Sequence, residues 1–173
     1  GEQKGLGTSE VKWFAKSSGT TNARSKFIPV SQEDLDDCHF KAGKDMVSVY
    51  VNNHPETRIF TGKGLAIGGS QQINQFDTNS NSYYGDVSAV LMRNLPFWAQ
   101  LIRTPKLDIA LMSECEEKIE KMARATIDEN VTNMLGVPTW TVVLLQKILE
   151  ITGKKHIGEV WPSLEVFFHG AVS

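Results

Sequence analysis

The chain has 173 residues, of which 40% are hydrophobic and 22% charged, and its formal net charge at pH 7 is −2. This length and composition are typical of a soluble domain with a real hydrophobic core. The chain lacks the basic excess of nucleic-acid-binding domains and any apolar run long enough to span a membrane. We therefore expect no nucleic-acid partner, no membrane partner and a cytoplasmic location. Cys38 and Cys115 lie far apart, which predicts reduced thiols and no metal site.

The two ends of the chain predict a fragment of a longer protein. The chain begins with Gly1 rather than methionine and ends at Ser173, directly after an apparent strand. Residues 1–10 are polar and are expected to be a flexible lead-in, and residues 11–173 are expected to be the structured part. A strand at a cut edge leaves backbone groups unpaired, so we expect the fragment to self-associate through that edge.

A loop rich in hydroxyl side chains lies between two short apolar runs, residues 11–14 and 27–30, that are typical of strands. Its candidate phosphate-binding residues are Ser17, Ser18, Gly19, Thr20, Thr21 and Lys26. Hydroxyls, clustered backbone N–H groups and one positive charge can together hold a phosphate. An ordinary polar hairpin turn is the alternative interpretation. The spacing differs from that of a Walker A loop.

After this loop, Ser31 is predicted to begin a helix that continues to about Asn53, with one apolar face at helical spacing. We expect this face to be buried; its members are Leu35, Cys38, Ala42, Met46, Val49 and Tyr50. Residues 58–60 and 65–67 are short strand candidates. Residues 71–84 are rich in Asn, Ser and Asp and predict an exposed loop or hairpin.

The middle of the chain predicts three helices. Asp86 can cap a helix over residues 87–92, Pro96 interrupts it, and residues 99–102 continue as a second short helix. Ser113 and Glu116 form a capping box that opens the third helix. Its charged face is expected to be solvated; the face consists of Glu116, Glu117, Lys118, Glu120 and Lys121.

The last third of the chain has the clearest pattern. Residues 131–137 predict a strand, residues 140–151 a helix ended by Gly153, and residues 164–168 another strand. A strand, a helix and a strand with short connections form a βαβ unit, whose strands pair in parallel. The predicted fold class is therefore α/β, a mixed sheet with a C-terminal parallel βαβ unit.

The order Ser-Ser-Gly-Thr-Thr followed by a lysine resembles the ATP phosphate loop of adenylate-forming enzymes. The spacer length resembles that of one branch, the Gretchen Hagen family of auxin-responsive acyl-acid amido synthetases. Further blocks resemble the same family in the same order, at residues 85–90, 94–98, 136–140 and 161–165. The resemblance covers roughly residues 11–173 and implies the central part of a large N-terminal adenylation domain.

The resemblance implies that ATP, with Mg²⁺, activates a carboxylic acid as an acyl-adenylate, and that an amine or amino acid then forms an amide. It assigns the loop residues to the β- and γ-phosphates, and it assigns His169, Gly170 and Ala171 to adenine. It assigns an acyl pocket to Leu95, Phe97, Trp98, Val137, Pro138 and Trp140. Without the family, a strand end with a turn and an ordinary apolar core are the simpler interpretations of these two groups.

Two other functions stay open at this point, an acyl-CoA ligase of the same superfamily and a noncatalytic nucleotide-binding module. No residue pair in the chain is suited to general acid and base catalysis, so the catalytic residues stay unassigned. The family's adenylate motif and mobile C-terminal domain are expected after Ser173, so we expect the fragment to be inactive by itself. The acid, the amine and the oligomeric state are not identified by the sequence.

Overall fold

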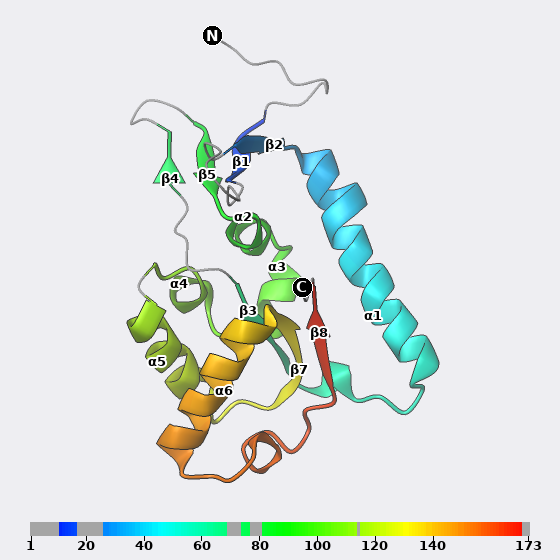
Figure 1. The fold of residues 1–173 in the computed structure, drawn as a ribbon. Helices are drawn as coiled ribbons and strands as arrows, with labels where there is room; N and C mark the ends of the chain where they lie inside the picture. The colour runs from blue at the N-terminus through cyan, green and yellow to red at the C-terminus, as the bar shows by residue number, and fades with distance from the viewer. Residues whose placement is uncertain (1–10, 17–25, 69–73, 77–80, 114, 171–173) are drawn as a thin grey trace. The chain divides into compact units, whose positions relative to one another are not determined.

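The structure is a computed structural model that describes residues 11–16, 26–68, 74–76, 81–113 and 115–170. The chain divides into two compact units, which are described separately below (Figure 1). The first unit comprises residues 1–55 and 71–94, and the second comprises residues 56–70 and 95–173. The chain therefore leaves the first unit, enters the second, and returns to the first before it ends in the second.

The first unit contains a four-stranded mixed sheet with the order β2–β1–β5–β4. Strands β1 (Trp13–Lys16) and β2 (Phe27–Val30) are antiparallel, and they are the strands predicted on either side of the hydroxyl-rich loop. Strand β5 (Tyr83–Gly85) is parallel to β1 and antiparallel to β4 (Asn74–Gln75), which confirms a hairpin in this region. A small core joins this sheet to helix α2 (Val87–Arg93) and consists of Ala15, Val30, Leu35 and Val90.

The predicted helix after Ser31 is present, with a π-helical segment η1 (Asp34–Phe40) that continues as α1 (Lys41–Asn53). Its start is held by Ser31, whose Oγ accepts a hydrogen bond from the Asp34 N–H at 3.1 Å. The predicted buried face is wrong beyond Leu35. Cys38 is exposed, Val49 is 61% exposed, and no residue of α1 is buried. The reason is that the core of the first unit extends along this helix only as far as Phe40.

The second unit contains a four-stranded sheet with the order β6–β3–β7–β8, in which all neighbours are parallel. Its strands are β3 (Lys63–Ile67), β6 (Arg103–Thr104), β7 (Val131–Gly136) and β8 (Val166–His169). Helix α6 (Pro138–Thr152) connects β7 to β8 and ends at Gly153, whose φ of 65° is left-handed. The predicted βαβ unit and fold class are therefore confirmed.

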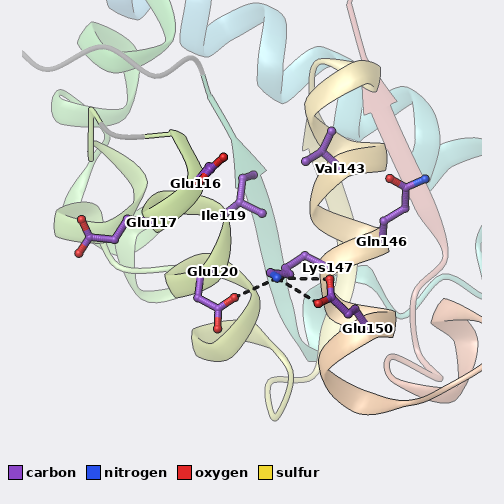
Figure 2. A pocket seen from close by; sticks show the side chains of 8 residues that line it. All are labelled: Glu116, Glu117, Ile119, Glu120, Val143, Gln146, Lys147 and Glu150. Atoms are coloured by element: carbon purple, nitrogen blue, oxygen red, sulfur yellow. Dashed lines mark hydrogen bonds and ion pairs between the residues drawn. The ribbon is translucent and has the colours of Figure 1, made fainter.

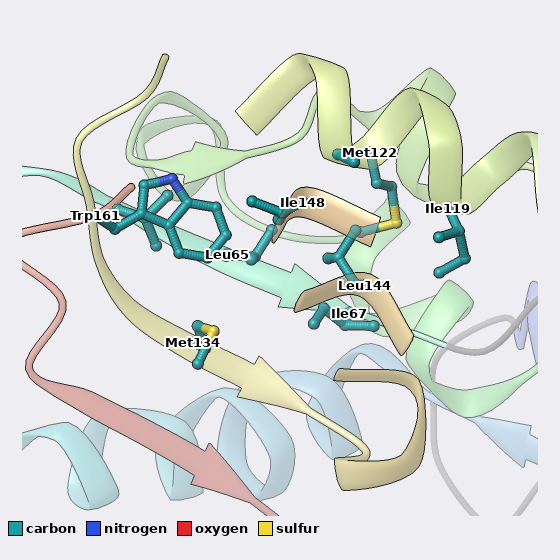
Figure 3. Close-up of a cluster of buried hydrophobic side chains, with 10 residues drawn as sticks. Leu65, Ile67, Ile119, Met122, Met134, Leu144, Ile148 and Trp161 are labelled. Atoms are coloured by element: carbon teal, nitrogen blue, oxygen red, sulfur yellow. The ribbon is translucent and has the colours of Figure 1, made fainter. Parts of the chain in front are cut away.

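Helices α5 (Cys115–Thr126) and α6 pack together and cover one face of this sheet (Figure 3). The core between them is apolar and includes Leu65, Ile67, Met122, Met134, Leu144, Ile148 and Trp161. Trp161 is buried, and its indole N–H donates to the Thr126 carbonyl at 3.0 Å. Burial of each large apolar side chain contributes about 1.5–3 kcal/mol, so this core fixes the position of β7 relative to α6.

The predicted strand at residues 58–60 is wrong, because this segment is the 3₁₀-helix η2 (Ile59–Thr61). The turn is held by a distant side chain: Glu165 accepts hydrogen bonds from the Arg58 N–H at 2.8 Å and from the Thr57 hydroxyl. The Thr61 N–H then donates to the Arg58 carbonyl at 2.9 Å. These hydrogen bonds compete successfully with strand pairing.

Two of the remaining helices, α2 (Val87–Arg93) and α3 (Phe97–Leu101), confirm the predicted pair of short helices in this region. Helix α4 (Leu107–Ala110) and the 3₁₀-helix η3 (Ile157–Glu159) were not predicted. Pro96 occupies the N-cap position of α3, so the proline both ends the previous segment and begins the next helix. None of the helices in the described part of the chain combines the length and the apolar character that crossing a membrane requires.

Candidate functional site

The candidate phosphate loop connects two strands that the structure does describe. Lys16 at the end of β1 pairs with Phe27 at the start of β2. Ser17, Ser18, Gly19, Thr20 and Thr21 lie outside the described residues, whereas Lys26 is described and exposed. The prediction that strands flank this loop is confirmed, and its binding of phosphate stays a prediction.

The candidate adenine residues follow the edge strand β8 in the second unit. Gly136 pairs with Ile67 of β3 on one side and with His169 of β8 on the other. These three residues are the last of their strands, so they lie together at the carboxyl edge of a parallel sheet. Ligands of open parallel α/β sheets bind outside this edge. His169 and Gly170 are exposed there, and Ala171 lies outside the described residues.

The sheet register brings one part of the predicted acyl pocket to the same edge. Val137 and Pro138 follow β7 directly, and they are therefore next to the end of β8. Val137 is 49% exposed, whereas Trp140 is partly buried and packs against the core of the second unit. The alternative interpretation of these residues as ordinary apolar core therefore holds in part for Trp140 and is wrong for Val137.

The other part of the predicted acyl pocket lies on α3 and the residues before it. Phe97 is 77% exposed and Trp98 is 55% exposed, while Leu95 is partly buried. Large side chains that remain this exposed on one short helix form an apolar surface, which commonly marks an interaction or ligand site. The sheet register therefore places the α6 group (Val137, Pro138 and Trp140) next to the end of β8. It gives no such position to the α3 group (Leu95, Phe97 and Trp98).

A groove that the sequence analysis did not identify lies between α5 and α6, with a volume of about 580 Å³ (Figure 2). Its walls carry four glutamates and one lysine. The lining residues are Glu116, Glu117, Ile119, Glu120, Val143, Gln146, Lys147 and Glu150. None of the residues predicted to bind ATP or the acid lines it. The sequence feature that could have indicated this groove is the run of charged residues at the start of α5.

Lys147 lies between the two helices and pairs with Glu120 at 3.4 Å and Glu150 at 3.2 Å (Figure 2). The hydrogen bond from Arg124 is the main cause of a lowered pKa at Glu120, and Lys147 adds to it. Hydrogen bonds with Glu150 and then Glu120 raise the pKa of Lys147. Water screens ion pairs of this kind, so the ion pairs of Lys147 contribute only modestly to holding the two helices together. We assign the groove no catalytic role.

The predicted solvation of the α5 charged face is confirmed for Glu116, Glu117 and Lys121, and it is wrong for Lys118. Lys118 is 4% exposed, and its Nζ donates to the Gly68 carbonyl at 3.5 Å. The long stem of a lysine allows its ammonium to reach this carbonyl, just after the end of β3, while the side chain as a whole is buried. No group of three His, Cys, Asp or Glu side chains suited to a metal ion occurs among the described residues.

A comparison with protein families matches the whole chain, residues 1–173, to the GH3 family N-terminal domain. No curated protein matches the chain. The matched family is the one that the motifs resemble, and the match extends over both units of the fold. The chain therefore belongs to the GH3 family of adenylate-forming acyl-acid amido synthetases, and it corresponds to that family's N-terminal domain.

Proposed function

We propose that this chain supplies the ATP-binding and acid-binding part of an acyl-acid amido synthetase. The observation that carries the proposal is the family match over residues 1–173. The parallel sheet supports it, because the register places His169 beside Gly136 at the carboxyl edge. That edge is where open α/β sheets bind nucleotides and other ligands.

The proposed reaction has two steps. In the first, a carboxylate oxygen of the acid attacks the α-phosphorus of ATP, the bond to the β-phosphate oxygen breaks, and pyrophosphate leaves. In the second, the nitrogen of an amine or amino acid attacks the acyl carbon, the bond from that carbon to the AMP oxygen breaks, and the nitrogen loses a proton. Mg²⁺ is the expected partner of the ATP phosphates.

The proposed roles of the residues follow the resemblance to the family and, for the described residues, their place in the sheet. Thr20, Thr21 and Lys26 bind the β- and γ-phosphates, where donors and a positive charge stabilise the charge that develops on the leaving group. His169 and Gly170 lie along adenine. The α3 and α6 groups contact the apolar body of the acid.

The test uses the full-length protein and measures exchange of labelled pyrophosphate into ATP as a function of added carboxylic acid. The proposal predicts exchange that requires an acid, and it predicts that hydroxylamine or amino acids consume the activated acyl group. Exchange without any dependence on acid would contradict the proposal. Release of AMP with coenzyme A as the preferred acceptor would instead identify an acyl-CoA ligase.

A further inference from the structure

Glu165 lies directly before the strand β8 and connects three segments of the second unit. Its N–H donates to the Thr132 carbonyl of β7 at 2.9 Å. Its carboxylate accepts a hydrogen bond from the Thr57 hydroxyl and another from the Arg58 N–H, the latter at 2.8 Å. Glu165 therefore ties the start of β8 both to the neighbouring strand and to a segment that lies 107 residues earlier in the chain.

The segment that Glu165 holds is itself fixed to the sheet. The hydroxyl of Thr132, a buried residue, donates to the Ile59 carbonyl at 2.6 Å. The Ile59 side chain is also buried, and the Lys63 N–H donates to the Asn130 carbonyl at 2.8 Å. The segment is therefore a fixed reference point, and hydrogen bonds to it define where Glu165 lies along the direction of the strands.

The apolar pattern of β8 does not select its register by itself. The observed ladder pairs Val166 with Asn133 and Phe167 with Met134, and Phe167 packs against the core of the second unit. The next residue, Phe168, is of the same type, and all three apolar residues of β8 are partly buried. A shift of one residue turns every side chain of a strand to the opposite face. In β8 this shift puts one phenylalanine in the place of the other, so hydrophobic burial discriminates poorly between the two registers.

The hydrogen bonds of Glu165 distinguish these registers. One residue of a strand corresponds to a rise of about 3.3 Å, and a shift of one residue also points the side chain to the other face. Such a shift carries the carboxylate out of hydrogen-bonding distance of Thr57 and Arg58. The observed register keeps both hydrogen bonds, and the same register pairs His169 with Gly136 at the carboxyl edge.

We propose that Glu165 sets the register of β8 against β7 and is thereby a positioning residue for His169 and Gly170. The inference rests on the proposed function for the adenine role of these two residues. His169 is the last residue of β8, so a shift at the start of the strand displaces the candidate adenine residues by the same distance, about 3.3 Å. Glu165 itself needs no contact with a ligand for this role.

The test compares substitutions of Glu165 in the full-length protein by hydrogen exchange at single-residue resolution. Glu165→Ala removes both side-chain hydrogen bonds, and we expect the Arg58 amide and the protected amides of β8 to exchange about tenfold faster or more. Glu165→Gln can keep both hydrogen bonds, because an amide oxygen accepts from an N–H and an amide nitrogen donates to a hydroxyl. Its exchange rates should stay within about threefold of the original, since only the charge assistance is lost.

Glu159→Ala is the matched control. Glu159 is also an exposed glutamate before β8, but it accepts its hydrogen bond from the nearby Lys155 N–H, at 3.3 Å. This substitution should leave the exchange rates of the β8 amides unchanged. If Glu165→Ala does not fold, Thr57→Val replaces it, because it removes one of the two hydrogen bonds and leaves Glu165 in place. It should accelerate exchange of the same β8 amides.

The kinetics of acid-dependent pyrophosphate exchange separate positioning from a merely structural role. Contacts with adenine are remote from the α-phosphorus and are equal in the ground state and the transition state, so their loss raises KM and leaves kcat unchanged. Glu165→Ala should raise KM for ATP at least about fivefold with kcat within about twofold of the original. In Glu165→Gln, both constants should stay within about twofold, because its hydrogen bonds persist.

Three results would overturn the proposal. The first is unchanged exchange of the β8 amides in Glu165→Ala, or in Thr57→Val if that variant replaces it. The second is a KM for ATP that the same variant leaves unchanged. The third is a loss in Glu165→Gln as large as that in Glu165→Ala. If the original protein catalyses no acid-dependent exchange, the proposed function fails together with the adenine role, whereas hydrogen exchange still decides whether Glu165 sets the register of β8.

Discussion

The glycine at the end of β7 allows a sharp test of the carboxyl edge on which the candidate site is built. Gly136 lies between Ile67 and His169 in the sheet. A Cβ added at Gly136 would lie 2.7 Å from the Ile67 carbonyl oxygen and 2.9 Å from its Cβ. A backbone carbonyl within a sheet cannot rotate aside without losing its hydrogen bond. In Gly136→Ala, the end of β7 must therefore move away from β3.

Overpacking of this kind costs about 1–3 kcal/mol, so we expect Gly136→Ala to lower the free energy of unfolding of the second unit by that amount. Urea denaturation followed by tryptophan fluorescence measures it, because Trp161 is buried in this unit. Gly158→Ala is the matched control, because its added Cβ meets only His156 ring atoms, at 3.5 and 3.9 Å. It should change stability by less than about 1 kcal/mol. Equal urea midpoints for Gly136→Ala and the original chain would refute the close pairing of β3 with β7.

Four further predictions follow from the loop, the fold and the groove. Thr20→Ala combined with Thr21→Ala, or Lys26→Ala alone, should reduce acid-dependent pyrophosphate exchange by the full-length protein at least about tenfold, whereas exchange within twofold in both variants would make the loop an ordinary turn. Calorimetry should give the 173-residue chain an ATP dissociation constant no better than about 1 mM, and micromolar binding would show that the site is complete within these residues. Trp161→Phe should lower the free energy of unfolding by about 1–3 kcal/mol, because a buried carbonyl loses its donor; an unchanged urea midpoint would contradict this. Glu120→Gln should destabilise the fold slightly at neutral pH, because it removes the interactions with Arg124 and Lys147 that favour the charged carboxylate and lower its pKa, and the difference should vanish as the pH falls through that pKa. A difference that persists at low pH in urea titrations would show that the ion pairs are not its cause.

The part of the fold that the sequence predicted well is the part where local pattern and tertiary structure agree. The apolar runs of β7 and β8 and the helix between them require a parallel pair, and the structure has it. Gly153 follows the last apolar position of α6 and takes the left-handed conformation that ends a helix. In these segments the local conformational preference of each residue agrees with the conformation that the tertiary fold requires.

The predictions that failed depend on partners distant in the sequence. The pattern of residues 58–60 predicts a strand, but a hydrogen bond to Glu165, which is remote in the chain, holds them in a turn. The α1 stripe has the spacing of a buried face, but the core of its unit does not extend beside it. Lys118 belongs to a charged run, yet the end of β3 gives its ammonium a carbonyl to bind. Local periodicity carries no information about such contacts.

The candidate site was predictable in its motifs and not in its geometry. The resemblance identified His169 and Val137 as members of different groups, and only the sheet register shows that β7 and β8 end side by side. Chemistry assembled across strands becomes visible only once the strand order is known.

Formation of an acyl-adenylate can be tested by following an oxygen atom. The full-length protein is incubated with ATP, an amino acid and a carboxylic acid whose carboxylate carries heavy oxygen, and the products are analysed by mass spectrometry. If the carboxylate attacks the α-phosphorus and the amine then displaces AMP, one labelled oxygen appears in AMP and the amide retains the other. Label that appears in inorganic phosphate, with ADP as the nucleotide product, would show activation at the γ-phosphate and contradict the proposed function.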